Sequence, residues 1–168
     1  MRVRTLVTDC DIRHAAMVDA ADIIFVTQRA YAEPARPGAP LLFVDEDEES
    51  VARDMDRGWK IMIAHHGGLP VGAVRWRREA ETVRVARLVV DPLHRRRGIA
   101  SALLRSVEEE AAMLGIHKLV GEAPMSNGFA SYFERHGFAF QNERMIGPLR
   151  FVEMVKEGDR IHPSSRAK

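Results

Sequence analysis

Residues 85–111 read VARLVVDPLHRRRGIASALLRSVEEEA, a run in which the pattern changes from that of a strand to that of a helix. Residues 82–90 alternate and then become continuously apolar, which predicts a strand buried on both faces. The strand is expected to end at Asp91 and Pro92, because proline has no N–H group to donate to a ladder. From Ile99 onward, apolar residues recur with helical spacing. The sequence therefore predicts a strand, a short turn and an amphipathic helix.

The turn between these two elements, residues 94–100, predicts an anion-binding site. The first N–H groups of a helix have no partners inside the helix, and the helix dipole favours negative charge at that end. Gly98 and Ala100 leave room for a ligand beside the backbone, and the three arginines at residues 95–97 add positive charge. We therefore expect phosphate oxygens to bind here.

The turn has the form R-x-x-G-x-A at residues 95–100, and a second stretch, YFERHGF, occupies residues 132–138. The first resembles the pyrophosphate-binding motif of the GCN5-related N-acetyltransferase (GNAT) family, in which an Arg or Gln opens the turn and a Gly or Ala closes it. The second resembles the helix and Gly-Phe pair that close the same fold. Both stand in the family's order, with a strand expected between them at residues 118–122.

The resemblance implies an α/β fold with a mixed, mostly antiparallel sheet and helices on both faces. Its two central parallel strands, expected here at residues 82–90 and 118–122, would splay apart and admit the pantetheine arm of acetyl-CoA, the implied cofactor. Backbone groups of Leu88 and Val90 would then bond the pantetheine amides as another strand does. The residues expected to contact coenzyme A are Leu88, Val89, Val90, Arg95, Arg96, Arg97, Gly98, Ile99, Ala100, Ser101, Asn127 and Phe133.

Consecutive arginines also occur in nucleic-acid-binding proteins and in solvated turns. This chain has 25 Lys and Arg residues against 24 Asp and Glu residues, and a formal net charge of +1. No aromatic residues are interleaved with the three arginines. One basic turn on a nearly neutral protein favours a small phosphorylated ligand over a nucleic acid, so no nucleic-acid partner is expected.

Length and composition predict one ordinary globular domain. The chain has 168 residues, of which 46% are hydrophobic, enough to bury a core. Cys10 is the single cysteine, so no internal disulfide can form and a reducing, cytoplasmic location is expected. No apolar run approaches the roughly 18 residues of a membrane span, so no membrane partner is expected. We expect the domain at residues 1–157 and a loosely held tail at 158–168.

The rest of the chain is expected to complete the sheet and its helices. Gly67 and Gly68 indicate a hairpin between two of the strands. An apolar strand near the C-terminus and the open edges of a mixed sheet predict a possible homodimer. The remaining strands are predicted at residues 3–7, 60–65, 71–78, 138–142 and 149–155, and the remaining helices at 11–31, 46–57 and 127–136.

Acetyl transfer to an amine requires a group that removes the ammonium proton. For a lysine-like amine this costs about 4 to 5 kcal/mol at pH 7. Relatives often place a glutamate on the central strand, but Arg84 and Arg87 stand at the matching positions. Glu122, five residues before Asn127, resembles the glutamate that other members keep on the neighbouring strand. We expect Glu122 to act as base or to organise a water; the alternative is a strand-end carboxylate that caps the next turn.

The acid that protonates the departing thiolate is expected to be Tyr132. In many relatives a tyrosine stands four residues before the Gly-Phe pair, but that position here is Phe133. Tyr132 lies one residue earlier, which is about 100° around a helix. Its hydroxyl either reaches the thiolate or serves packing and the acceptor pocket.

These features predict an acetyl-CoA-dependent N-acetyltransferase that acts on the primary amine of a small molecule by direct attack in a ternary complex. Two alternatives stay open, a protein or peptide N-acetyltransferase and a non-catalytic acyl-CoA-binding module. No metal is expected, because the adjacent His65 and His66 point to opposite faces of a strand.

Overall fold

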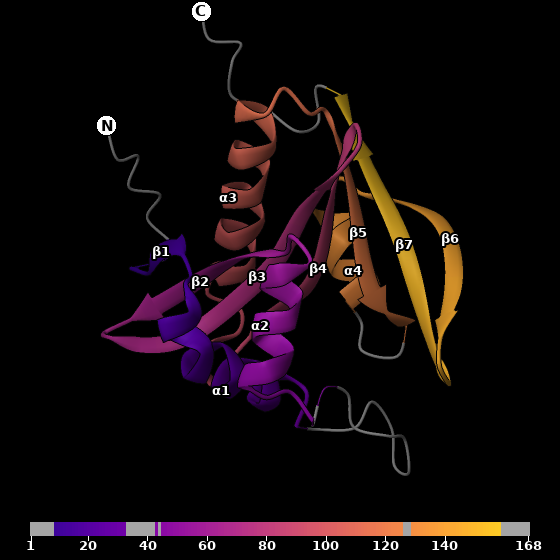
Figure 1. Cartoon of the computed structure of the whole chain (residues 1–168). Helices are drawn as coiled ribbons and strands as arrows, with labels where there is room; N and C mark the ends of the chain where they lie inside the picture. Colours follow the sequence, from indigo (N-terminus) through magenta and orange to yellow (C-terminus); the bar gives the residue numbers. More distant parts are fainter. Residues whose placement is uncertain (1–8, 33–42, 44, 126–128, 159–168) are drawn as a thin grey trace, which may run out of the picture. The chain divides into compact units, whose positions relative to one another are not determined.

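The computed structural model describes residues 9–32, 43, 45–125 and 129–158. Within these residues, seven strands form one sheet in the order β1-β2-β3-β4-β5-β7-β6 (Figure 1). The expected strand at residues 3–7, Asn127 and nearly all of the expected tail lie outside the described residues. The strands are β1 (Asp11–His14), β2 (Lys60–His66), β3 (Leu69–Glu79), β4 (Thr82–Val90), β5 (Lys118–Pro124), β6 (Ala139–Ile146) and β7 (Leu149–Glu157). The helices are α1 (Ala20–Ala30), α2 (Glu48–Asp56), α3 (Ile99–Met113) and α4 (Phe129–Arg135), with short 3-10 turns η1 (Met17–Asp19) and η2 (Pro92–His94).

The chain divides into two compact units. Unit 1 comprises residues 1–75 and 88–106, and unit 2 comprises residues 76–87 and 107–168. Strands β3 and β4 and helix α3 contribute residues to both units. No described helix is both long enough and apolar enough to cross a membrane.

In unit 1, helices cover both faces of β3. A Cβ atom on Gly72 would lie 3.0 Å from Ile99 Cγ2 and 3.1 Å from Leu103 Cδ1, so the first turns of α3 pack directly on this glycine. Arg75 lies three residues further along the strand and therefore points to the opposite face. There its buried guanidinium pairs with Asp54 of α2 and with Glu46. Helix α3 and helix α2 thus lie on opposite faces of this strand.

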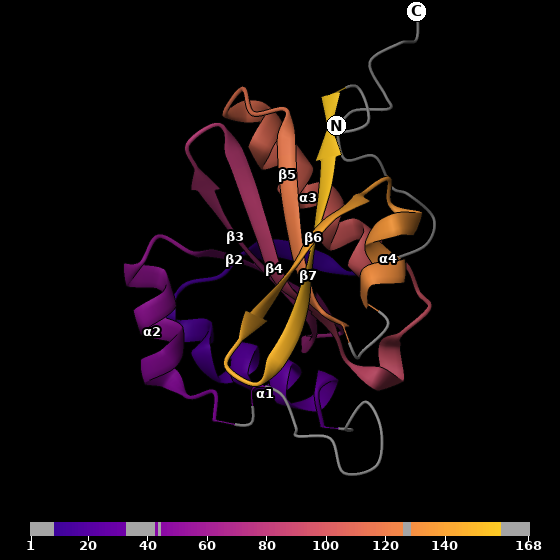
Figure 2. The same ribbon diagram turned by 90° about the vertical axis from the view of Figure 1, so that its right-hand side faces the viewer.

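In unit 2, β4 and β5 form the parallel pair, with Val83 aligned with Leu119 and Val85 aligned with Gly121. Strand β7 pairs antiparallel with β5 on one side and with β6 on the other. Figure 2 shows β7 running beside β5. A Cβ atom on Gly121 would lie 2.7 Å from the Phe133 ring, so α4 packs closely against this face of β5. The mixed sheet with a central parallel pair confirms the expected fold class.

The expected helix at residues 11–31 is wrong in its first part. Residues Asp11–His14 form β1, which pairs antiparallel with β2. The weak helical spacing is overridden because the open edge of β2 bonds this backbone. The helical turn begins only after Ala16, whose N–H group donates to the Asp19 carboxylate at 2.9 Å. The other expected strands and helices within the described residues are confirmed, with some of their ends shifted.

The apolar strand that suggested a homodimer is confirmed as a strand, but it lies in the interior of the sheet. Strand β7 is paired on both sides, and Phe151, Val152 and Met154 are buried in unit 2. The edge strand of the sheet within unit 2 is β6, whose eight residues are all exposed. The homodimer stays a prediction, without support from β7.

Candidate active site

The turn between β4 and α3, in unit 1, is built on two residues with positive φ. Arg96 has a φ of 62° and Gly98 has a φ of 76°. Glycine adopts this conformation without steric cost, whereas the left-handed region costs about 1 to 2 kcal/mol for other residues. A non-glycine residue held there at a turn before a long helix is a feature of functional sites.

An ion pair with one buried partner holds the start of this turn. Arg29 of α1 binds the Asp91 carboxylate through Nε and, at 3.2 Å, through Nη2. The Asp91 residue is only 3% exposed, and its carboxylate also accepts a hydrogen bond from the Leu93 N–H group at 2.9 Å. The Arg29 guanidinium and the Leu93 N–H group hold the pKa of Asp91 below its ordinary value. Asp91 therefore fixes where the strand ends and where the turn begins.

The three arginines of the turn differ in position. Arg95 folds back onto the backbone, with Nη2 donating to the Ala30 carbonyl at 3.1 Å and Nε to the Val90 carbonyl at 3.4 Å. Arg96 and Arg97 are exposed at the start of α3. The turn thus combines two exposed guanidinium groups with the N–H groups of a 15-residue helix. This donor set fits a diphosphate.

Unit 2 carries a cluster of charged side chains on one face of its sheet. Glu122 of β5 and Glu153 of β7 are direct cross-strand partners. Arg84 of β4 donates from Nη1 to Glu153 at 2.9 Å and to Glu122 at 3.2 Å, and from Nε to Glu79 at 2.9 Å. Arg144 of β6 approaches Glu122 at 3.6 Å and Glu153 at 4.0 Å. We call these residues, with Arg77, the carboxylate cluster.

Hydrogen bonds within the cluster favour the charged forms of Arg84 and Glu79 despite their partial burial. Burial by itself lowers the pKa of Arg84, but hydrogen bonds to Glu79 and Glu153 outweigh it and raise that pKa above its ordinary value. Burial likewise acts to raise the pKa of Glu79, yet its bonds with Arg84 and Arg77 hold the pKa below its usual range. Both hydrogen-bonded partners, Arg84 and Glu79, thus favour their charged forms.

The two residues considered for the acid position face different surroundings. Phe133 is buried in unit 2, where its ring lies against Gly121 and meets Phe138 edge-on at 4.9 Å between centroids. Tyr132 is half-buried and stacks on His136, with 4.5 Å between ring centroids. Their expected roles, Phe133 beside the cofactor and Tyr132 as acid, stay predictions.

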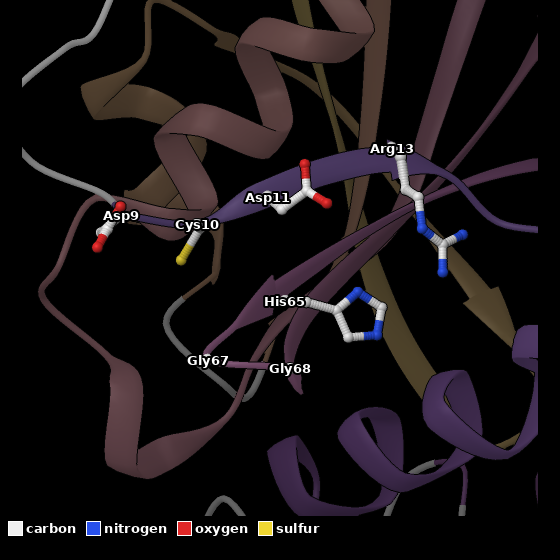
Figure 3. A pocket seen from close by; sticks show the side chains of 7 residues that line it. All are labelled: Asp9, Cys10, Asp11, Arg13, His65, Gly67 and Gly68. Carbon is white, nitrogen blue, oxygen red and sulfur yellow. The ribbon is translucent and has the colours of Figure 1, made fainter.

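A hollow of about 600 Å³ in unit 1 includes none of the expected site residues (Figure 3). Its strongest polar groups are already paired, because Arg13 binds Asp19 at 2.8 Å and His65 lies 2.9 Å from Asp22. Burial and the neighbouring Asp9 raise the pKa of the Cys10 thiol, so this cysteine is a poor nucleophile. The residues that line the hollow are Asp9, Cys10, Asp11, Arg13, His65, Gly67 and Gly68.

The sequence pattern indicates Glu122 but not its partners. Arg84 appeared only as a departure from the family, and Glu153, Glu79 and Arg144 were not considered. The available signal was Glu153 itself, a charged residue in the middle of the apolar run of β7. A buried carboxylate needs a partner, so such a residue predicts a cation on a neighbouring strand.

Comparison with known proteins agrees with this fold. The structure resembles PaiA N-acetyltransferase from Thermoplasma acidophilum, solved with coenzyme A, at 16% identity and a TM-score of 0.75 over 90% of this chain and 100% of that one. It also resembles the ribosomal-protein-S18-alanine N-acetyltransferase from Escherichia coli, at 20% identity and a TM-score of 0.71 over 88% and 93% of the two chains. YncA from Salmonella typhimurium, solved with its cofactor acetyl-CoA, is 20% identical, with a TM-score of 0.64 over 89% and 94%.

These likenesses concern the fold, and no curated protein sequence matches the chain. The family is established by sequence, since residues 41–158 match the family described as "Acetyltransferase (GNAT) domain". The expectations of the family, of an acetyltransferase and of acetyl-CoA as cofactor are thereby confirmed. The chain belongs to the GNAT family of acetyl-CoA-dependent N-acetyltransferases.

Proposed function

We propose that the chain transfers the acetyl group of acetyl-CoA to the primary amine of a small molecule, by direct attack in a ternary complex. The observation that carries this proposal is the Glu122 carboxylate, whose side chain is 15% exposed on the sheet face of unit 2 and held by Arg84. A carboxylate that is fixed and still accessible suits a group that must receive a proton from a bound amine.

The cofactor is proposed to bind through the turn of unit 1. Arg96, Arg97 and the first N–H groups of α3 would hold the diphosphate, with Gly98 permitting the close approach. The backbone of residues 88–90 would bond the pantetheine amides, and Ile99, Ala100 and Ser101 would line the helix start. When bound, acetyl-CoA supplies an acetyl thioester, whose carbonyl carbon is the electrophile.

The side chains are proposed to move two protons. Glu122 takes the ammonium proton of the acceptor, directly or through a water, and the amine nitrogen then bonds to the carbonyl carbon. The carbon–sulfur bond would then break, and the thiolate would receive a proton from Tyr132 or from water. The nitrogen would lose its second proton to the resulting Tyr132 phenolate or to hydroxide, which leaves a neutral amide. A coenzyme A thiol is an acceptable leaving group, so the acid contributes less than the base. Direct attack is favoured because the raised pKa of Cys10 makes it unsuited to carry an acyl group.

Three further expectations remain part of the proposal. They are one domain to residue 157, a cytoplasmic location and a homodimer. Light scattering at tens of micromolar tests the last, because a monomer mass there would contradict it.

The test of the function is release of free thiol from acetyl-CoA in the presence of separate panels of small primary amines and of peptides with free N-termini. We expect turnover with at least one class of small amine, with the acetylated amine identified by mass spectrometry. Turnover of peptides alone would replace the acceptor by a protein. Tight coenzyme A binding without any transfer would instead favour a non-catalytic acyl-CoA-binding module.

A further inference from the structure

We propose that the acceptor binds as an ammonium ion between Glu122 and Glu153, in the place that the Arg144 guanidinium occupies in this structure. The enzyme would then select alkylamines, which are cations at neutral pH, over arylamines, which are not. This inference rests on the proposed function and names the class of its acceptor.

Two carboxylates stand side by side in this cluster. Glu122 and Glu153 are aligned on neighbouring antiparallel strands, and their side chains are only 15% and 12% exposed. Like charges directly opposite each other destabilise a sheet unless a cation lies between them. Arg84, whose side chain is 16% exposed, binds both carboxylates and satisfies one side of the pair. A second cation is needed on the side that solvent reaches.

Arg144 supplies that second cation, but it is the loosest member of the cluster. Its nearest contacts with the pair, at 3.6 and 4.0 Å, are longer than hydrogen bonds. Its side chain is 46% exposed, and it stands on the edge strand β6. A long contact made by a half-exposed side chain holds its partner weakly, so the guanidinium can be displaced at little cost.

Charge balance then defines the ligand that can replace it. The cluster contains three carboxylates, on Glu79, Glu122 and Glu153, and three guanidinium groups, on Arg77, Arg84 and Arg144. Exchange of Arg144 for one ammonium group keeps this balance, and three N–H donors allow bonds to both carboxylates. An uncharged amine would leave a partly buried negative charge without compensation, which is costly. The bound ammonium also lies where Glu122 can take its proton.

Benzylamine and aniline form a matched pair of probes, because both carry one ring but only benzylamine is a cation at neutral pH. In Glu153→Gln we expect KM for benzylamine to rise about tenfold while kcat changes less than about threefold, as loss of a ground-state contact predicts. In Arg144→Gln we expect KM for benzylamine to fall several-fold, because the competing cation is gone. Aniline kinetics should change little in either variant.

The control is Glu143→Gln, which removes an exposed carboxylate on β6 that pairs with Arg150 at 3.8 Å, outside the cluster. It should leave both probes unaffected. An unchanged KM for benzylamine in both cluster variants, or an equal effect on aniline, would overturn the inference. If the wild type acetylates neither probe, benzylamine binding to the coenzyme A-loaded protein is measured by calorimetry. Binding that Glu153→Gln weakens would support the inference although the proposed function had failed, and absence of binding would overturn it.

Discussion

Two regions of the molecule differ in how the chain assembles them. One is the turn between β4 and α3, and the other is the carboxylate cluster on strands β3 to β7. The turn consists of consecutive residues, 91–98, and its donors are mainly backbone N–H groups placed by two positive φ angles. The cluster takes its residues from five strands, and its bond between Arg84 and Glu153 joins positions 69 residues apart. On the proposed function, a local segment binds the cofactor, which is the same for every acceptor, and residues from distant segments bind the acceptor.

The turn and the carboxylate cluster are expected to respond differently to substitution. Only a substitution by proline removes a backbone N–H donor, so the turn is otherwise sensitive to residues that change its dihedral angles. The cluster depends on balanced charges, so its sensitivity lies in single side chains whose loss leaves a partner uncompensated. The comparison predicts that a glycine governs cofactor affinity and that a carboxylate governs catalysis.

The largest effect is expected from Gly98→Val. A β-branched residue at a φ of 76° is strained, and its side chain would occupy the space where the phosphates approach. We expect coenzyme A affinity to fall by about a hundredfold or more, measured by isothermal titration calorimetry, because the site loses its donor geometry.

The matched control is Gly115→Val, since Gly115 has a φ of 71° with no atom within 4 Å of its Cβ position. It carries a similar conformational cost two residues after the end of α3 and belongs to unit 2, so coenzyme A affinity should be retained. Undiminished affinity in a folded Gly98→Val protein would show that the turn is not the cofactor site.

The sequence was sufficient to predict the turn because all of its determinants are adjacent. A strand pattern, a proline stop, a glycine and the onset of helical spacing each act within a few residues. The same local reasoning failed at residues 11–14, where pairing with β2 decided the structure. Propensity could not reveal that, since the partner strand lies 50 residues away.

The cluster could be predicted only in part, for the same reason. Glu122 was found through its resemblance to a glutamate of the family, but its neighbour Glu153 depends on the strand order β5-β7-β6. That order inserts the last strand between two earlier ones. The alternation of β7 identifies Glu153 as a charge in an apolar run, yet nothing local shows which strand supplies its cation.

The next largest effect is expected from removing the proposed base, Glu122, and it should exceed the effect of removing the proposed acid, Tyr132. We expect Glu122→Gln to lower kcat/KM by tenfold or more at neutral pH, within the ~10² to 10⁴ range of acid–base groups. The deficit should shrink as the pH approaches the pKa of the amine, because more of the acceptor is then already deprotonated. Tyr132→Phe should cost less, since thiolate departure does not depend on a strong acid.

The control for Glu122→Gln is Glu157→Gln. It removes an exposed ion pair between β5 and β7, in which Glu157 lies 3.1 Å from Lys118. It should leave kcat/KM unchanged from pH 6 to 9. A larger loss in Tyr132→Phe than in Glu122→Gln, or a silent Glu122→Gln across this range, would assign the base to another group.

The smallest effect is expected from breaking the ion pair between Arg29 and Asp91, where a side-chain contact supports the backbone of the turn. Arg29→Gln should lower coenzyme A affinity about two- to threefold and the Tm at pH 7 by about 2 °C, a magnitude typical of a partly exposed ion pair. Because Arg29 holds the pKa of Asp91 below the ordinary 3.8, the pair stabilises the fold above that pH and loses its effect as the pH falls through the lowered pKa. The Tm difference between wild type and variant should therefore narrow below about pH 4.

The control is Arg13→Gln, which removes a comparable ion pair outside the turn. Its partner is Asp19, whose pKa is lowered to about 2. This variant should change Tm in the same direction without changing coenzyme A affinity. Equal loss of affinity in both variants would mean that the turn responds to the stability of unit 1 as a whole, and not to the carboxylate that begins it.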